Sequence, residues 1–310
     1  MEVTGISIEE EEKYEDELLE ISKKNKSVIM ALVASYVGQK ISPTKIQNAQ
    51  VNVMDEFSVE SAIENIKKKT DCRKLMLLLN SPGGSIASSY KIARALRISF
   101  EDITVYIPHV AASGGTLIAL IGNVIVMGMM SQLSPLDPIL DEIGGRPVSA
   151  KLIVDANSTL TSFFETTPLE DAPYTAKILA DKYDPVQIQE AEAIMDLMER
   201  YVCEVLEKSN YTESDVQRIA HQLVRGFSIH EEVINELAGK KLGLKIKSCE
   251  EFPREWMILR KWLGTLLMES SGTHLVRYYI HPTLIKNTSA ESQLPTAGVE
   301  DLRAMSKIMS

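Results

Sequence analysis

The feature that most limits the fold of this chain is a unit that occurs twice between residues 75 and 140. Each copy is an apolar run of strand length, followed by a turn with two adjacent glycines and then by a helical pattern. A continuous apolar run is typical of a strand that is buried on both faces, as in parallel sheets covered by helices. The doubled unit therefore predicts an α/β fold.

The first copy begins with the apolar residues 75–79 and turns through the sequence NSPGGS at residues 80–85. Pro82 removes a backbone donor and fixes φ, whereas Gly83 and Gly84 permit conformations that a side chain forbids. Apolar residues at near-helical spacing follow. Ser85 is therefore predicted to cap a helix.

The second copy alternates apolar residues over 103–107 and reaches AASGGT at residues 111–116. A bend between strand and helix would expose the hydroxyl of Ser113, and the N–H of Gly114 would place positive potential beside it. If the first glycine turn lies alongside, the N–H of Gly84 is a second donor, and two convergent donors form an oxyanion hole. The competing interpretation is close helix-to-strand packing with Ser113 as an ordinary N-cap.

As a pair separated by about thirty residues, NSPGGS and AASGGT resemble the signature of the Clp protease and signal peptide peptidase A superfamily, which shares the crotonase fold. The segments IPHVAASGGTLIAL and SPLDPI are similar to the serine dehydrogenase proteinase family. This resemblance covers residues 28–244. It implies a crotonase/Clp-protease-like spiral of strand-strand-helix units with a helical C-terminal part.

The resemblance also implies roles for individual residues. By matching position, Ser113 is the nucleophile of a serine peptidase, and Gly84 and Gly114 are the oxyanion donors. Gly83 belongs to the same turn and lines the site. His109 matches the Pro-His of the family and is expected to line the site or brace the turn rather than take the proton.

The general base is left open by the sequence. Clp proteases carry their base in a His-Gln-Pro triplet, where this chain has Leu136, Asp137 and Pro138, so a Clp-type triad in that order is absent. Asp137 is counted among the residues that line the site. Its carboxylate either orients a base or, as we prefer, hydrogen-bonds the backbone of its own loop.

His230 is one candidate base. Ser228 and Glu231 form a capping-box pattern, which predicts that His230 lies in the first turn of a helix. A helix N-terminus disfavours the imidazolium form, so a neutral His230 would be available to accept a proton. The competing interpretation is a surface histidine on a capped helix.

Lys182 is an equal candidate, and Lys177 is a third. Signal peptide peptidase A uses a Ser-Lys pair, with the lysine ahead of a long helix, and Lys182 precedes the long helical pattern of residues 188–206. A lysine acts as a base only when burial or neighbouring cations lower its pKa. A solvated lysine is the alternative for both positions.

Charge and cysteine usage limit the partners and the compartment. A formal net charge of -10 disfavours nucleic acid as a main partner, because backbone phosphates would be repelled. Three widely spaced cysteines suit a reducing cytoplasm and form neither a disulfide framework nor a zinc cluster.

The apolar run at residues 28–37 is too short to cross a bilayer. The glycines do not follow the dinucleotide spacing G-x-G-x-x-G, so no nicotinamide cofactor is expected, and no pyridoxal cofactor either; the scattered cysteines imply no metal.

We divide the chain into three parts: an N-terminal helical extension at 1–26, a Clp/crotonase-like serine protease domain at 27–250, and a C-terminal helix and tail at 251–310. The first part begins with glutamates and ends with lysines, which indicates a solvated helix. A short strand is expected at Val51 and Val53. His274 and His281 lie outside the resemblance.

The predicted function is a serine hydrolase, most simply a peptidase acting on peptides or unfolded protein. Homo-oligomerisation is expected from analogy of fold. The methionine-bearing helical pattern at 188–206 is expected to be core or to offer a surface for oligomerisation. Two alternatives remain open. One is a crotonase-type enzyme that binds an acyl thioester and stabilises an enolate with the same donors. The other is a catalytically silent scaffold that binds peptides.

Overall fold

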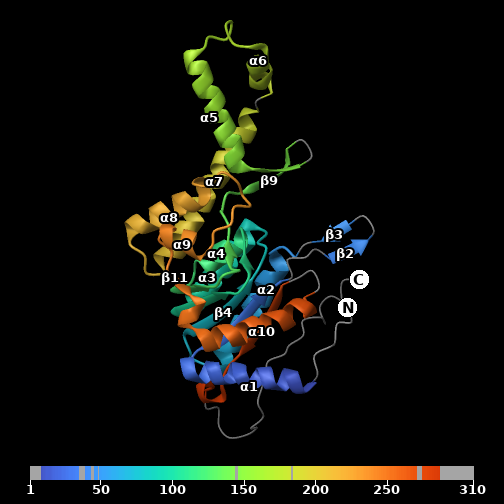
Figure 1. The fold of residues 1–310 in the computed structure, drawn as a ribbon, viewed down its shortest axis with the longest axis vertical. Coiled ribbons are helices and arrows are strands. Elements are labelled where there is room, and N and C mark those ends of the chain that lie inside the picture. Colours follow the sequence, from blue (N-terminus) through green and yellow to red (C-terminus); the bar gives the residue numbers. More distant parts are fainter. Residues whose placement is uncertain are drawn as a thin grey trace.

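The protein is described here by a computed structural model, which covers residues 8–34, 39–42, 45–47, 49–143, 146–182, 184–270 and 274–286. Its centre is a six-stranded sheet (Figure 1). All neighbouring strands run parallel except the last pair, which is antiparallel. The strand order is β11 (Ile246–Ser248), β7 (Val124–Met127), β5 (Asp102–Ile107), β4 (Lys74–Asn80), β1 (Val28–Val33) and β12 (Leu275–Tyr279). The predicted α/β fold is confirmed.

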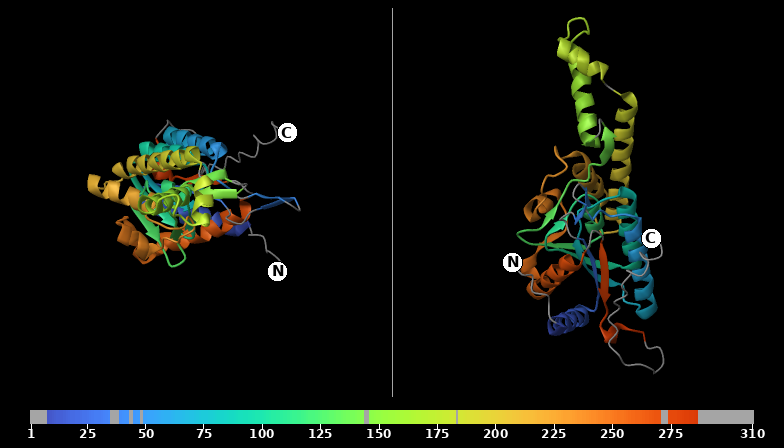
Figure 2. Two further views of the ribbon diagram at one scale, coloured as in Figure 1. Left: turned by 90° about the horizontal axis from the view of Figure 1, so that it is seen from above. Right: turned by 90° about the vertical axis from the view of Figure 1, so that its right-hand side faces the viewer.

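Successive side chains of the central strands contact opposite faces of this sheet. On β4, Leu77 belongs to the larger apolar core, whereas Met76 and Leu78 belong to a smaller core on the other face. Both faces are covered by helices, as Figure 2 shows. The apolar run that leads into the first glycine turn is therefore a strand buried on both faces, as predicted.

The helices divide between the two faces. The smaller core packs against α1 (Ile8–Asn25) and α10 (Pro253–Glu269). The larger core packs against α2 (Val53–Lys69), α3 (Ile86–Ser99), α4 (Gly114–Ala119), α7 (Pro185–Glu207), α8 (Glu213–Arg225) and α9 (Glu236–Leu242). Single turns of 3-10 helix occur at Cys249–Glu251 and Pro282–Leu284. Ser85 caps α3 through its hydroxyl, as expected.

Several local expectations are wrong. The helix α1 is not merely solvated, because Leu18 is buried against α10 and the sheet. Val53 begins α2 instead of a strand, since Asn52 caps that helix in a capping box with Asp55. By contrast, Met195 and Met198 of α7 are buried in the larger core, which is one of the two places expected for the methionines of this helix.

The C-terminal part contributes to the same sheet. The strand β12 pairs with β1, and α10 contacts both β1 and β4. The division of the chain at residues 27–250 and 251–310 stays a prediction. Residues 287–310, which belong to the predicted tail, lie outside the described residues.

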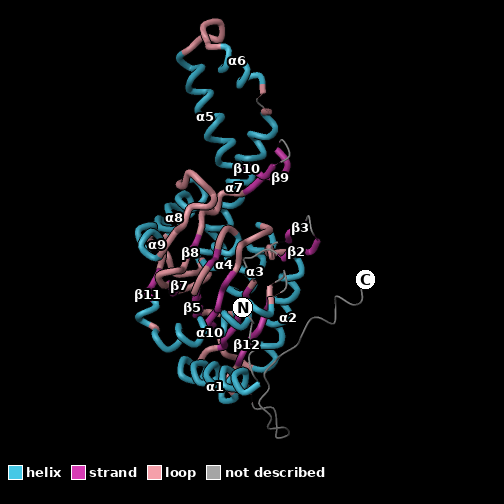
Figure 3. The backbone as a smooth tube through the Cα atoms, turned by 45° about the vertical axis from the view of Figure 1, so that its right-hand side comes forward, coloured by secondary structure: helices cyan, strands magenta, loops and turns pink. Residues whose placement is uncertain are grey.

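Two pieces project from the body. One, called the arm below, consists of α5 (Ala150–Thr166), α6 (Tyr174–Asp181) and the first turns of α7 (Figures 1 and 3). Its base carries the hairpin of β9 (Ile139–Ile143) and β10 (Arg146–Ser149). In α5 only Ala150 is buried among the described side chains, and in α6 none is. The other projection is the hairpin of β2 (Gln39–Ser42) and β3 (Lys45–Gln47) (Figure 1).

Leu77→Ala tests the burial of the central strand. Leu77 has no exposed surface, so we expect the substitution to lower the free energy of unfolding by about 2–5 kcal/mol, measured by urea denaturation. The matched control is Leu237→Ala on α9, where the side chain is 62% exposed and a change within about 0.5 kcal/mol is expected. Equal losses at the two positions would contradict this placement of β4.

Candidate active site

Four backbone segments lie side by side beyond the carboxyl ends of β4 and β5. Ser81 bridges Ala111 in parallel, β6 (Val110–Ala111) pairs with β8 (Gln132–Leu133) in parallel, and Leu133 bridges Ile234 in antiparallel. We call Ser81, Ala111, Leu133 and Ile234 the bridge ladder. Ligands of open α/β sheets bind beyond the carboxyl ends of the strands, which makes this edge the natural place for a site.

The bridge ladder is supported at its start by Asn80. The buried Asn80 side chain donates to the carbonyl of Ala34 at 2.7 Å and accepts from the N–H of Val110 at 3.2 Å. The next residue, Ser81, donates from its backbone N–H to the carbonyl of Val110 at 2.9 Å. Its own carbonyl accepts from the backbone N–H of Ala112, also at 2.9 Å. The two glycine turns are therefore held at a fixed distance by the backbone that precedes them.

Ser113 occupies a strained bend between β6 and α4. Its φ is 48° and its ψ is -121°, a conformation that non-glycine residues rarely adopt. Its side chain makes no capping hydrogen bond to α4, and the residue is partly exposed. Its backbone N–H donates to Ser134 Oγ at 2.6 Å. This geometry excludes an ordinary N-cap and matches a nucleophile elbow.

The two glycine bends meet beside this serine. The φ of Gly84 is 151°, and a Cβ placed on Gly114 would lie 3.3 Å from the backbone nitrogen of Gly84 and 2.2 Å from Ser89 Oγ. Only glycine permits this approach. Val51 hydrogen-bonds the residues on either side of Gly84, accepting from Ser85 and donating to Gly83. Among the described residues, no group accepts a hydrogen bond from the N–H of Gly84 or Gly114.

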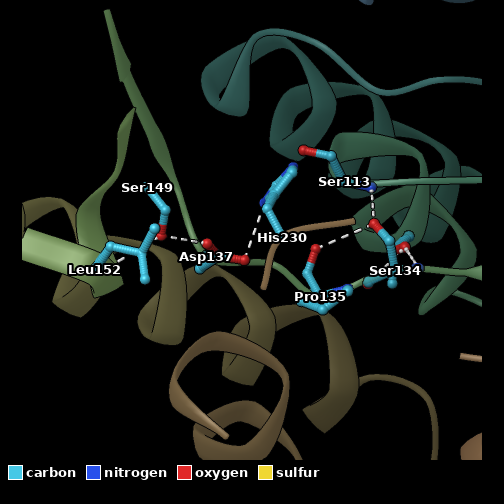
Figure 4. Close-up of polar contacts among 8 residues, drawn as sticks. Ser113, Ser134, Pro135, Asp137, Ser149, Leu152 and His230 are labelled. Atoms are coloured by element: carbon cyan, nitrogen blue, oxygen red, sulfur yellow. Dashed lines mark hydrogen bonds and ion pairs between the residues drawn. The ribbon is translucent and has the colours of Figure 1, made fainter. Parts of the chain in front are cut away.

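His230 lies between Ser113 and Asp137, as Figure 4 shows. Its Nδ1 is 2.9 Å from Asp137 Oδ1, and the opposite end of the ring faces the Ser113 side chain. Asp137 is buried, and its other carboxylate oxygen accepts a hydrogen bond from Ser149 Oγ at 2.6 Å. An Nδ1–H that donates to the carboxylate leaves Nε2 as the acceptor on the side of Ser113.

The electrostatics of His230 follow from this pair. Burial by itself would lower the pKa of His230, but the hydrogen bond to Asp137 and the charges of Asp137 and Glu231 outweigh burial. The pKa of His230 is therefore raised above its ordinary value. Asp137 both fixes the ring orientation and stabilises the imidazolium that would form when His230 accepts a proton.

Two expectations about this pair are wrong. His230 lies in a turn and not in the first turn of a helix, because α9 begins at Glu236 with Asn235 as its N-cap. No helix N-terminus keeps its imidazole neutral. The Asp137 carboxylate contacts His230 and Ser149 instead of the backbone of its own loop.

The backbone explains why His230 reaches Asp137. Leu133 and Ile234 exchange two hydrogen bonds of 2.9 Å, and the N–H of Leu136 donates to the carbonyl of Leu223 at 2.8 Å. The first pair joins the segment before Asp137 to the segment after His230, and the second contact joins the Asp137 segment to α8. The resulting order along the chain is serine, aspartate, histidine, the order found in α/β-hydrolases and not in Clp proteases.

Two supporting residues were missed in the sequence. Ser149 carried a usable signal, because it directly precedes α5 and its hydroxyl caps that helix. Ser134 carried none. Its contact with Ser113 arises from the bridge ladder, which brings together segments that are distant in sequence.

The lysine candidates are not near Ser113. Lys182 is exposed at the C-terminal end of α6, and the Nζ of Lys177 donates to the carbonyl of Glu170 at 2.9 Å. Both lie on the arm, well away from α4 (Figure 1). Within this chain, neither can take a proton from Ser113.

His109 contributes to the site through its backbone. Its carbonyl accepts from the N–H of Gln132 at 2.8 Å, directly before the paired strands β6 and β8. Its side chain is exposed. Bracing of the turn is thus seen in the backbone, and a contact between the imidazole and a substrate stays a prediction.

The described residues contain neither a metal-binding cluster nor a membrane-spanning helix. In that part of the chain, no three or more His, Cys, Asp or Glu side chains are grouped so as to hold a metal ion. None of its helices combines the length and the apolar character needed to span a bilayer.

Comparison with other proteins gives two relatives in Methanocaldococcus jannaschii, both described as uncharacterized. One is 27% identical over 229 residues, covering 74% of this chain and 71% of the relative. The other is 29% identical over 189 residues, covering 61% of this chain and 57% of the relative. Neither description states a function.

Two solved structures are also similar, both of mutants of a membrane-bound stomatin-specific protease. The first has 15% identity and a TM-score of 0.42, over 64% of this chain and 75% of that one. The second, in complex with a substrate peptide, has 18% identity and a TM-score of 0.40, over 64% of this chain and 71% of that one. At these values, neither structure contributes to the assignment of function.

The family comparison is decisive. The model of the ClpP-like SDH-type serine proteinases matches residues 10–291, a wider range than the resemblance seen at 28–244, and one that includes His274. Since this match spans most of the chain, the protein belongs to the ClpP-like SDH-type serine proteinase family and is a serine peptidase.

Proposed function

We propose that this peptidase cleaves peptides or unfolded protein with Ser113 as nucleophile, His230 as general base and Asp137 as the residue that orients the base. The backbone N–H groups of Gly84 and Gly114 form the oxyanion hole. The observation that carries this proposal is the 2.9 Å contact of His230 with Asp137, on the side of the ring away from the strained Ser113 bend.

The proposed reaction follows from these positions. His230 Nε2 takes the proton of the Ser113 hydroxyl as Oγ attacks the scissile carbonyl carbon. The carbonyl oxygen becomes an oxyanion between the N–H groups of Gly84 and Gly114. His230 then gives its proton to the leaving amine as the C–N bond breaks. Water, activated by the same imidazole, releases the acyl group from Ser113.

This assignment disfavours the alternatives. A catalytically silent scaffold was suggested by the lack of an evident base, and His230 with Asp137 supplies one. A crotonase-type enzyme would leave Ser113 incidental, yet Ser113 is held in a strained bend with its hydroxyl uncommitted to a helix cap. Strain of this kind persists only where the surrounding structure enforces it.

Exposed apolar side chains support unfolded protein as the substrate. Val53, Met54 and Phe57 are more than half exposed on one face of α2, directly after the Val51 segment that pairs with the Gly84 turn. Ile229 and Val233 are more than half exposed on either side of His230. Such side chains near a site favour the apolar segments that unfolded chains present.

We also propose a cytoplasmic homo-oligomer without nucleic acid partners. Unpaired cysteines at 72, 203 and 249 suit a reducing compartment, and the charge of -10 disfavours nucleic acid. The arm supports self-association, because it exposes large apolar side chains and buries little of its own. These are Leu152, Leu169, Tyr174, Ile178, Leu179 and Val186.

The nucleophile and base are tested by Ser113→Ala and His230→Ala. We expect each to lower kcat for a fluorogenic peptide by roughly 10⁴-fold or more, because nucleophile and base act as one unit. A fluorophosphonate should modify the wild-type protein at Ser113, detected by mass spectrometry of the labelled peptide.

Controls for this experiment are Ser58→Ala, on the surface of α2, and Lys182→Ala, on the arm. Both should keep wild-type activity and labelling. Labelling that persists in Ser113→Ala, or activity that depends on Lys182 and not on His230, would contradict the proposal.

The pH profile tests the role of Asp137. The neutral imidazole accepts the proton, and the pKa of His230 is raised above 6.5, so kcat/KM should fall as pH drops through a value above 6.5. Asp137→Asn removes the charge that raises this pKa. Burial then lowers the pKa of His230, so the fall of kcat/KM on the acidic side of the profile should move to lower pH. At the same time kcat should fall about 10⁴-fold, because the ring tautomer of His230 is no longer held. If the acidic side of the kcat/KM profile stays at the same pH in Asp137→Asn, a group other than His230 titrates there.

Light scattering tests the proposed role of the arm. Leu179→Glu places a charge among the apolar side chains of α6, so the oligomer should dissociate to smaller species. The matched control, Leu237→Glu, changes a leucine of similar exposure on α9 and should leave the mass unchanged. A wild-type protein that is monomeric at every concentration tested, or a Leu179→Glu oligomer of unchanged mass, would rule out this interface.

A further inference from the structure

A second set of serine, histidine and aspartate lies behind the oxyanion turn. Ser81 Oγ is 2.8 Å from His274 Nε2, and His274 Nδ1 is 3.2 Å from Asp55 Oδ2. Ser81 follows β4, His274 precedes β12, and Asp55 is in the first turn of α2. Three segments that are distant in sequence therefore meet at this point, directly before Gly83 and Gly84.

This second set is closed to substrates. The side chains of His274 and Asp55 are 0% and 3% exposed, and Ser81 is also 0% exposed. Ser81 Oγ already accepts a hydrogen bond from the N–H of Gly83 at 3.1 Å. A hydroxyl in this position cannot approach a substrate carbonyl, so the set is not a second catalytic centre.

The hydrogen-bond pattern instead gives the Ser81 hydroxyl a single orientation. A histidine that faces a carboxylate through Nδ1 carries its proton there, which leaves Nε2 as an acceptor. The Ser81 O–H then donates to Nε2, and its oxygen accepts from the N–H of Gly83. The Ser81 hydroxyl thus joins His274 Nε2 at 2.8 Å to the N–H of Gly83 at 3.1 Å, and buried hydrogen bonds of this kind are costly to break.

Asp55 also connects the Ser81–His274 pair to Val51, the second residue that supports the glycine turn. Its Oδ2 accepts from the N–H of Asn52 at 2.8 Å, and the preceding residue, Val51, donates to the carbonyl of Gly83 at 2.7 Å. The peptide between Gly83 and Gly84 is thus held at its carbonyl by Val51 and at the preceding N–H by Ser81. The N–H of Gly84 belongs to that same peptide.

We propose that His274, oriented by Asp55, is a positioning residue that holds the Gly84 N–H in the oxyanion hole through the Ser81 hydroxyl. This inference rests on the proposed function of Ser113 and Gly84. His274 touches neither the substrate nor Ser113. Its loss should therefore weaken stabilisation of the transition state and leave substrate binding unchanged, which appears as a lower kcat at constant KM.

Three variants test this proposal: His274→Gln, Asp55→Asn and Ser81→Ala. Loss of one oxyanion donor costs about 100-fold or more in rate, and a displaced donor should cost about 10-fold to 100-fold in kcat, with KM within about twofold of wild type. Fluorophosphonate labelling of Ser113 should slow by a similar factor. In a Ser113→Ala background, the same three variants should bind an uncleaved peptide with wild-type affinity.

Matched controls separate this role from simple packing. His221→Gln changes a histidine on α8 whose side chain is 61% exposed, and Ser58→Ala removes a serine hydroxyl on the surface of α2. Both should behave as wild type. Thermal unfolding of every variant gives the folded fraction at the assay temperature, by which kcat is corrected. If His274→Gln does not fold, Ser81→Ala, which removes one oxygen atom, decides the question.

The outcomes are distinct. A corrected kcat that falls at least tenfold while KM and peptide affinity stay constant supports the proposal. Folded variants with wild-type kcat, or a loss explained entirely by the unfolded fraction or by weaker peptide binding, overturn it. A wild-type protein that is neither labelled at Ser113 nor active overturns the proposed function itself, and this inference with it.

Discussion

The site depends on the backbone hydrogen bonds of the bridge ladder. Adjacent strands lie about 4.8 Å apart whatever their side chains, so each bridge places one functional segment beside the next. The Ser81 segment carries the Gly84 turn, the Ala111 segment carries Ser113, the Leu133 segment leads to Asp137, and Ile234 follows His230. Groups that are far apart in sequence are thus ordered by main-chain contacts, and the side chains only complete the arrangement.

Much of the first half of this arrangement was predictable from the sequence. The strands, the two bends and the positions of Ser113, Gly84 and Gly114 follow from apolar runs and paired glycines, which are local patterns. The partnership of His230 with Asp137 was not predictable, because it depends on the pairing of Leu133 with Ile234. The chain turns at His230 and Glu231 and then pairs with Leu133 at Ile234, so the helix begins only after Asn235 and not at the capping-box pattern of Ser228.

The lysine hypothesis failed for a related reason. Lys182 does precede a long helix, as the analogy with signal peptide peptidase A required, but that helix begins on the arm and enters the core only near Ala191. The position of Lys182 along the chain therefore fitted the analogy, but its position in the fold is far from Ser113. The two serine-histidine-aspartate sets give the same lesson, because their composition is identical and only the structure shows that Ser81 is buried with its hydroxyl hydrogen-bonded, whereas Ser113 is partly exposed in a strained bend.

The pairing of β12 with β1 joins the last described strand to the first. Ser113, Asp137 and His230 all precede His274 in the chain, so the proposed role of His274 requires β12 to pair with β1 before the turn that carries Gly84 is fully supported. A chain in which β12 has not yet docked would lack the contact of Ser81 with His274 and hold the Gly84 turn without that support.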